Sequence, residues 1–167
     1  MGNPHQPVPF LDSNGDSVVV DGNPLLRPTN LPPELYAQSG LSVRSWVDDL
    51  NRDLPNVTEN PETLMAMAVK ILLPLAPGGP LDAERFDWTY VLDYRRYQNI
   101  MIGVYGAAAG MSEEDVLSLI DLYAWPISHF HEKERLDDVY THSARQDVGD
   151  TKFGYELFRS GRIRLKP

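Results

Sequence analysis

The chain has 167 residues, of which 42% are hydrophobic, and it carries a formal net charge of −9 at pH 7 and no cysteine. This length allows about one domain with a real core, and the lack of cysteine excludes disulfides, thiolate metal sites and cysteine nucleophiles. The sequence shows neither an apolar run near 18 residues nor a Sec signal peptide, so we predict no membrane span. Because the acidic total repels phosphate backbones at long range, nucleic-acid binding would need a local basic patch, and residues 152–167 are the candidate.

The N-terminal third is rich in residues that break helices. Nine of the fourteen prolines lie in residues 1–61, which predicts an extended lead-in or linker over 1–58 with one amphipathic helix at about 43–53. Asp21-Gly22 after Val18–Val20 predicts a short hairpin. The Asp-x-Asn-x-Asp spacing that begins at Asp12 lacks an acid at position 23, so we predict no calcium loop there.

For the remainder, residues 59–167, the pattern predicts a compact, mainly α domain. We expect about five helices in the whole chain, with a short strand or hairpin. Asn60-Pro61 begins an almost uniformly apolar, buried helix that is ended by Pro74 together with Pro77-Gly-Gly-Pro80. Alternating residues at 86–92 favour a short strand, although a helix stays open. An apolar stripe predicts a helix over 97–108 with Gly110 as its cap, and Ser112 caps the next helix. The last helix is predicted over about 150–160, ended by Gly161.

The helix over 97–108 contains glycines at positions where they lower its stability. Each interior glycine costs about 1 kcal/mol relative to alanine. One explanation is close helix packing. The other is a cleft in which substrate approaches Gly103 and Gly106, with Tyr105 beside them, and these three residues are our predicted substrate contacts on this helix.

Candidate catalytic residues collect between residues 129 and 150, which we predict to be a long functional loop. The densest group of polar residues there comprises His142, Arg145, Gln146, Asp147 and Asp150. It combines a side chain that titrates near neutrality, an arginine that can bind an anion in a bidentate manner, and carboxylates that could orient either of them. The alternative is that Asp147 or Asp150 only caps the last helix. His129 and His131 leave a metal open as a hypothesis, but we assign no metal and no cofactor.

A second polar cluster stands at the entry of the glycine-rich helix. It comprises Asp93 as a candidate catalytic carboxylate and Arg95 and Arg96, whose guanidinium groups suit a phosphate or carboxylate of the substrate. Solvated surface arginines are the alternative.

The chain resembles the bacterial polymorphic toxin type 44 domain over about 80 residues, from Phe86 to Gly161. The resemblance rests on Gly103-x-x-Gly106-x-x-x-Gly110-x-Ser112, on Asp147 shortly after a Tyr-Thr-His stretch, and on Gly154-Tyr155. It implies a mostly helical toxin domain that is secreted and delivered into a target bacterial cell, acts as a nuclease, and is neutralised by a cognate immunity protein.

Three functions follow as hypotheses. The first is a metal-independent ribonuclease with His142 as acid/base, Arg145 stabilising the phosphate and Asp147 orienting one of them. The second is a peptidoglycan glycan hydrolase that uses Asp93 and Asp147 as paired carboxylates. The third is a non-enzymatic acidic binding protein, such as an immunity factor.

Overall fold

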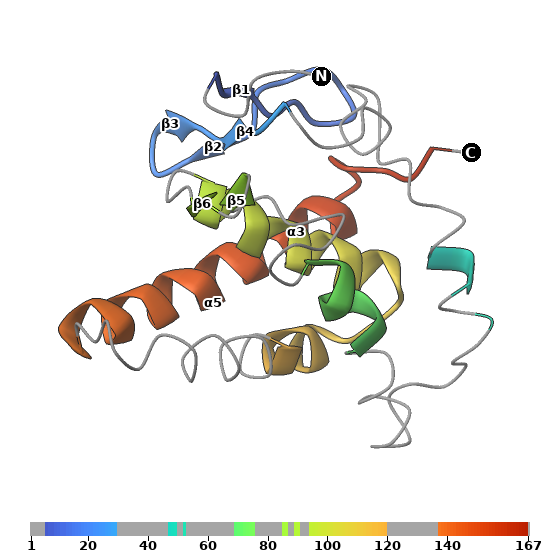
Figure 1. Cartoon of the computed structure of the whole chain (residues 1–167). Coiled ribbons are helices and arrows are strands. Elements are labelled where there is room, and N and C mark those ends of the chain that lie inside the picture. The colour runs from blue at the N-terminus through green and yellow to red at the C-terminus, as the bar shows by residue number, and fades with distance from the viewer. Residues whose placement is uncertain are drawn as a thin grey trace.

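The computed structural model describes residues 6–29, 47–49, 52, 69–75, 85–86, 89–90, 94–119 and 137–166, with only the backbone described at 85–86, 89–90 and 137–145. Its principal elements are two long helices, α3 (Arg95–Ala108) and α5 (Asp137–Arg159), which cross in Figure 1. Helical turns also occur at 47–49, 69–75 and 113–119. The mainly α fold class is therefore confirmed, and no helix in these ranges is long and apolar enough to cross a membrane.

The strands form short antiparallel pairs. β1 (Val8–Pro9) pairs with β4 (Leu26–Arg27), β2 (Val19–Val20) with β3 (Asn23–Pro24), and β5 (Arg85–Phe86) with β6 (Thr89–Tyr90). The hairpin predicted around Asp21-Gly22 is confirmed, and both turn residues have positive φ, as its tight turn requires. The extended structure predicted at 86–92 takes the form of two short strands rather than one, because Phe86 of β5 pairs antiparallel with Thr89 of β6.

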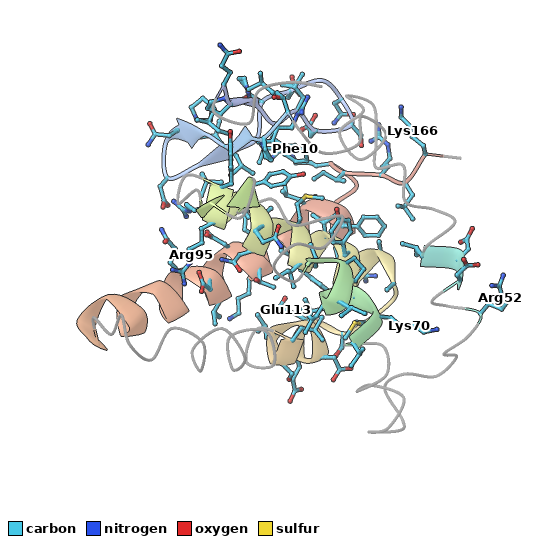
Figure 2. All side chains as sticks on the ribbon, viewed as in Figure 1. Phe10, Arg52, Lys70, Arg95, Glu113 and Lys166 are labelled. Atoms are coloured by element: carbon cyan, nitrogen blue, oxygen red, sulfur yellow. The ribbon has the colours of Figure 1, made fainter. Side chains whose placement is uncertain are left out.

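The N-terminal segment contributes to the same core as the helices. Phe10, Val18 and Leu25 are buried in one hydrophobic cluster with residues of α3. Phe10, labelled in Figure 2, lies below the N-terminal strands. Its ring meets that of Tyr97 edge-on, with 5.5 Å between ring centroids. Residues 6–29, which we expected to be part of a lead-in, therefore cover one side of α3.

Asp12 fastens this segment to the C-terminal residues. Its buried carboxylate accepts backbone N–H groups of Asn14 and Asp16 at 2.9 and 3.0 Å, and it pairs with Arg162 at 3.0 Å. Ser13 adds two bonds: its N–H donates to the Arg162 carbonyl, and its hydroxyl accepts the Arg164 N–H, both at 2.8 Å. The two ends of the described chain are thus joined through hydrogen bonds around one buried acid.

We expect Asp12 to make part of the stability dependent on pH. Burial raises its pKa, but the N–H groups of Asp16 and Asn14 together with Arg162 outweigh burial and hold the pKa below its ordinary value of 3.8. A depressed folded-state pKa contributes stability above pH 3.8 that is lost as pH falls through the folded-state value. Thermal unfolding between pH 6 and pH 2 should therefore show a smaller acid-induced loss of stability for Asp12→Asn than for the wild type. Equal losses in the two proteins would contradict this role.

The crossing of α3 and α5 is a backbone-to-backbone contact made possible by glycines. A Cβ at Gly103 would overlap the Thr151 carbonyl, and one at Gly154 would overlap the Ile100 carbonyl. Thr151 reinforces the contact, because its hydroxyl donates to the Asn99 carbonyl at 3.1 Å. Close packing therefore explains why α3 accepts a glycine at position 103.

The cleft predicted over the glycine-rich helix is consequently wrong. Gly103 is buried against α5, and a Cβ at Gly106 would overlap the side chain of Val116. Tyr105 is only 2% exposed, and its complete burial raises the pKa of its hydroxyl. The three predicted substrate contacts on α3 are packing positions that a substrate does not reach in this structure.

The ends of these helices follow the predicted capping chemistry. Gly110, at φ 80°, donates its N–H to the Ala107 carbonyl, and the Met111 N–H donates to the Gly106 carbonyl, which together form a Schellman motif. Ser112 caps the next helix, since its hydroxyl accepts the Asp115 N–H at 3.1 Å. Gly161, at φ 81°, follows α5. The predicted caps at Gly110 and Ser112 and the stop at Gly161 are confirmed.

Two predicted helices need correction. α5 begins at Asp137, so the second half of the predicted loop at 129–150 is helical, and Asp147 and Asp150 are interior residues rather than caps. Helix 69–75 includes Pro74 and is described as far as Leu75, whose carbonyl accepts a hydrogen bond from the Gln98 side chain at 3.0 Å. This helix is also not buried on all sides, because Leu73 is 68% exposed.

Candidate functional site

The candidate site lies where the first turns of α3 face the middle of α5. α3 presents Arg95, Arg96 and Asn99, and α5 presents Asp147 and Asp150, which are one turn apart on the same helix. Because i and i+3 positions share a helix face, both aspartates turn toward α3. The result is two arginine–aspartate pairs side by side across the helix interface.

The first pair joins Arg95 to Asp147. Nε of Arg95 donates to Oδ1 at 3.2 Å and Nη2 donates to Oδ2 at 2.7 Å, so the contact is bidentate. The Asn99 amide donates a third bond to Oδ1 at 2.8 Å. The Asp147 side chain is 13% exposed and that of Arg95 is 28% exposed. The Asp147 carboxylate on α5 thus accepts three hydrogen bonds from α3 and links the two helices.

The second pair connects Arg96 to two carboxylates. Nη2 of Arg96 donates to Asp150 Oδ1 at 2.8 Å and Nε donates to Oδ2 at 3.1 Å. The remaining nitrogen, Nη1, donates to Oδ2 of Asp21 at 2.7 Å. The Asp150 side chain is only 4% exposed, whereas that of Asp21, on the β2–β3 turn, is 77% exposed. One guanidinium therefore bridges a buried and an exposed acid.

These surroundings shift the ionisation of the second pair. Burial raises the pKa of Asp150; Arg96 opposes this effect, and the negative charges of Asp147 and Asp21 add to it. The hydrogen bond to Asp150 is the main reason that the pKa of Arg96 rises above its ordinary value. The arginine thus stays charged, while Asp150 holds a proton to higher pH than an ordinary aspartate.

A groove of about 630 Å³ opens beside the second pair. Its polar side comprises Asp21, Arg96, Gln146 and Asp150, and its apolar residues are Val19, Val20 and Phe153, with Gly149 completing the lining. The four contributions from α5 fall at positions 146, 149, 150 and 153, which form one stripe of the helix. The groove is therefore built between the β2–β3 hairpin and one face of α5.

The structure brings together only part of the predicted site. Arg95 and Asp147 lie together, but they form an ion pair with each other rather than separate substrate-binding and catalytic groups, and Arg96 pairs with Asp150 beside them. His142 and Arg145 lie on α5, within the range where only the backbone is described. Asp93, His129 and His131 lie outside the described residues. Within the described ranges, no cluster of three or more His, Cys, Asp or Glu residues suits a metal ion.

Sequence reasoning found part of the groove, because Arg96, Gln146 and Asp150 belong to the predicted polar clusters. It missed Asp21, which the sequence indicates only as a hairpin turn, and Gly149. One further signal is present in the sequence, because Arg95-Arg96 and Asp147/Asp150 are complementary in charge. Nothing in the sequence placed the hairpin of residues 19–24 against α5.

No protein family model, curated protein or solved structure matches the chain. The resemblance to the polymorphic toxin type 44 domain therefore stays a prediction that rests on its short motifs. The geometry of the site is the independent basis for a functional argument.

The Arg95–Asp147 pair should act mainly on stability. Asp147→Ala removes a carboxylate that accepts three hydrogen bonds and leaves Arg95 without this partner. We expect a loss of about 2 to 3 kcal/mol in the free energy of unfolding, because hydrogen bonds to charged groups contribute about 1.5 to 3 kcal/mol. Urea unfolding measures this loss of stability. Glu156→Ala, a substitution at an exposed position of the same helix, is the control. If the two variants are equally stable, then the Arg95–Asp147 pair contributes nothing to the free energy of unfolding.

Proposed function

We propose that the protein is a toxin-type hydrolase that cleaves the glycan strands of bacterial peptidoglycan. The observation that carries this proposal is the pair of carboxylates bridged by Arg96 in the groove, one buried with a raised pKa and the other exposed to solvent. Glycoside hydrolysis uses two carboxyl groups in these two states. The proposal replaces the pair Asp93 and Asp147 with Asp150 and Asp21.

Each acid has a distinct role in the proposed reaction. Asp150, protonated, donates its proton to the glycosidic oxygen as the bond to the anomeric carbon breaks. Asp21, ionised at the solvent-exposed side, stabilises the positive charge that develops on the sugar. It then accepts a proton from the water molecule whose oxygen bonds to the anomeric carbon. Arg96 holds both carboxylates in place and stabilises the negative charge that Asp150 acquires after it has donated its proton.

The lining of the groove also favours a sugar polymer. A pyranose ring has apolar C–H faces and polar hydroxyl edges, and the groove sets Val19, Val20 and Phe153 beside carboxylate, amide and guanidinium groups. Its lining residues include one arginine and two acids, so the groove has no excess of positive charge even when Asp150 is protonated. Binding of RNA depends on neutralising phosphates with basic groups, which this balance disfavours.

The biological context of the proposal comes from the resemblance to polymorphic toxin domains. A toxin of this kind is delivered into a competing bacterium and is blocked by a cognate immunity protein. Cleavage of peptidoglycan would then weaken the wall of the target cell. The acidic composition and the lack of cysteine are compatible with work at the cell wall.

A metal-independent ribonuclease is the second candidate, and one observation favours it. Helical periodicity places position 142 on the same side of α5 as Gln146 and Gly149, which follow it by four and seven residues, and it places position 145 on the same side as Gly149, which follows it by four. The backbone thus brings His142 and Arg145 to the stripe that lines the groove. A histidine and an arginine there would suit cleavage of a phosphodiester.

Parallel digestion of two substrates tests the proposal. Purified protein is incubated with peptidoglycan sacculi and, separately, with total RNA, and the released fragments are separated by liquid chromatography. We expect soluble muropeptides carrying new reducing ends and intact RNA. Cleaved RNA with intact sacculi would favour the ribonuclease, and no product from either would favour an acidic binding protein.

A further inference from the structure

Gly149 differs from the glycines that shape the helix crossing. It lies inside the 23-residue helix α5, where glycine is less favourable than alanine. Gly103, Gly106 and Gly154 each have a packing reason, because a Cβ there would overlap neighbouring atoms. A Cβ at Gly149 would meet no atom of the described chain within 4 Å, and its φ lies outside the positive range. Neither packing nor backbone conformation explains this glycine.

The position of Gly149 in the groove suggests what the missing side chain leaves room for. Gly149 is exposed and lines the groove between Gln146 and Phe153 on α5, with Asp150 next to it. A side chain at 149 would project from the middle of this stripe. Without one, a ligand can lie directly against the helix backbone and still reach the buried carboxylate of Asp150.

We propose that Gly149 forms the floor of a sugar subsite, in which one pyranose ring of the glycan strand lies flat against α5. Phe153 and the hairpin valines contact the C–H face of the ring, and the Gln146 amide bonds its hydroxyl groups. This places the glycosidic oxygen beside Asp150. The inference rests on the proposed glycan hydrolase function. It adds that the backbone of Gly149 contacts the sugar ring of the substrate.

Substitution of Gly149 separates a ligand floor from a structural role. Gly149→Ala should raise Tm by about 2 °C, because alanine is the better helix former and the site has room. The same variant should bind sacculi about 10-fold more weakly in a pelleting assay, since a single methyl group is worth about this factor in a fitted pocket. Gly149→Leu should abolish both pelleting and cleavage of sacculi. Glu156→Leu, an exposed position two turns further along α5, is the control for adding a leucine to this helix.

The outcomes distinguish the inference from the function on which it rests. Wild-type protein that cleaves sacculi, with Gly149→Leu cleaving as fast as Glu156→Leu, would overturn the subsite and leave the hydrolase standing. A Gly149→Ala protein that melts at a lower temperature than the wild type would also overturn it, because glycine would then have a structural reason. Wild-type protein that neither binds nor cleaves sacculi would overturn the function and the subsite together.

Discussion

Replacing Gly154 by leucine is expected to prevent the protein from folding. A Cβ at this position would already overlap the Ile100 carbonyl, and the Ile100 backbone cannot move without shifting the whole of α3. Overpacking a well-packed interior costs about 1 to 3 kcal/mol and sometimes more, and native domains are stable by only about 5 to 15 kcal/mol. A leucine between two helix backbones should exceed the usual range. Circular dichroism of Gly154→Leu should show no cooperative thermal transition.

A matched substitution at the surface controls for the change in composition. Lys152→Leu adds the same side chain to α5 at an exposed position, and it should unfold cooperatively with a Tm close to that of the wild type. If Gly154→Leu also melts near the wild-type temperature, then α3 and α5 do not cross through backbone contact at Gly154, and the arrangement of the site is wrong as well.

Asp150→Asn is expected to lower hydrolysis of sacculi by about 100-fold to 10,000-fold, the usual contribution of a general acid. Asparagine keeps the size of the side chain and an acceptor for Arg96, but it cannot donate a proton in the same way. The acid must be protonated to act, so wild-type activity should fall as pH rises through the raised pKa of Asp150. Initial rates across pH 4 to 8 measure both effects.

Asp147→Asn is the control for this experiment, because Asp147 also pairs with an arginine on α3 but does not line the groove. Its expected consequence is lower stability with activity retained at temperatures where the variant is folded. Equal losses of activity in the two variants would show that both pairs act only on the structure. Loss in Asp147→Asn alone would return Asp147 to the catalytic role first predicted from the sequence.

Much of the helical architecture could be predicted because its signals are local. The apolar stripe that includes Tyr97, Ile100 and Val104 marks α3, and Gly110 and Ser112 mark the corner that follows. The turn at Asp21-Gly22 is another local signal, since it depends on residues that tolerate positive φ. Each of these features is set by neighbours within a few positions along the chain.

The first half of α5 could not be predicted for a physical reason. Its contact with α3 near Asp147 and Asp150 is made by ion pairs instead of apolar side chains, so the usual hydrophobic periodicity is weak there. Because a segment rich in polar residues without periodicity is typical of a loop, the sequence predicts a functional loop there instead of a helix. Charge complementarity with Arg95 and Arg96 becomes visible only when both helices are placed side by side.

The groove depended on contacts that span most of the chain. Asp21 and Arg96 are 75 residues apart in sequence, yet they form a 2.7 Å contact. A hairpin of two-residue strands has no sequence feature that specifies which helix it covers. The glycines show a related limit: the sequence cannot tell whether a glycine faces another backbone, as Gly154 does, or open space, as Gly149 does.

The central claim is that water cleaves a glycosidic bond in the groove beside Asp150, and digestion of sacculi in H₂¹⁸O tests it most directly. Hydrolysis places one oxygen from water on each new reducing end, so mass spectrometry should find released muropeptides that are heavier by one ¹⁸O atom. Digests with Asp150→Asn should contain about 100-fold to 10,000-fold fewer labelled fragments. Intact sacculi, or fragments released without ¹⁸O at a reducing end, would contradict the account.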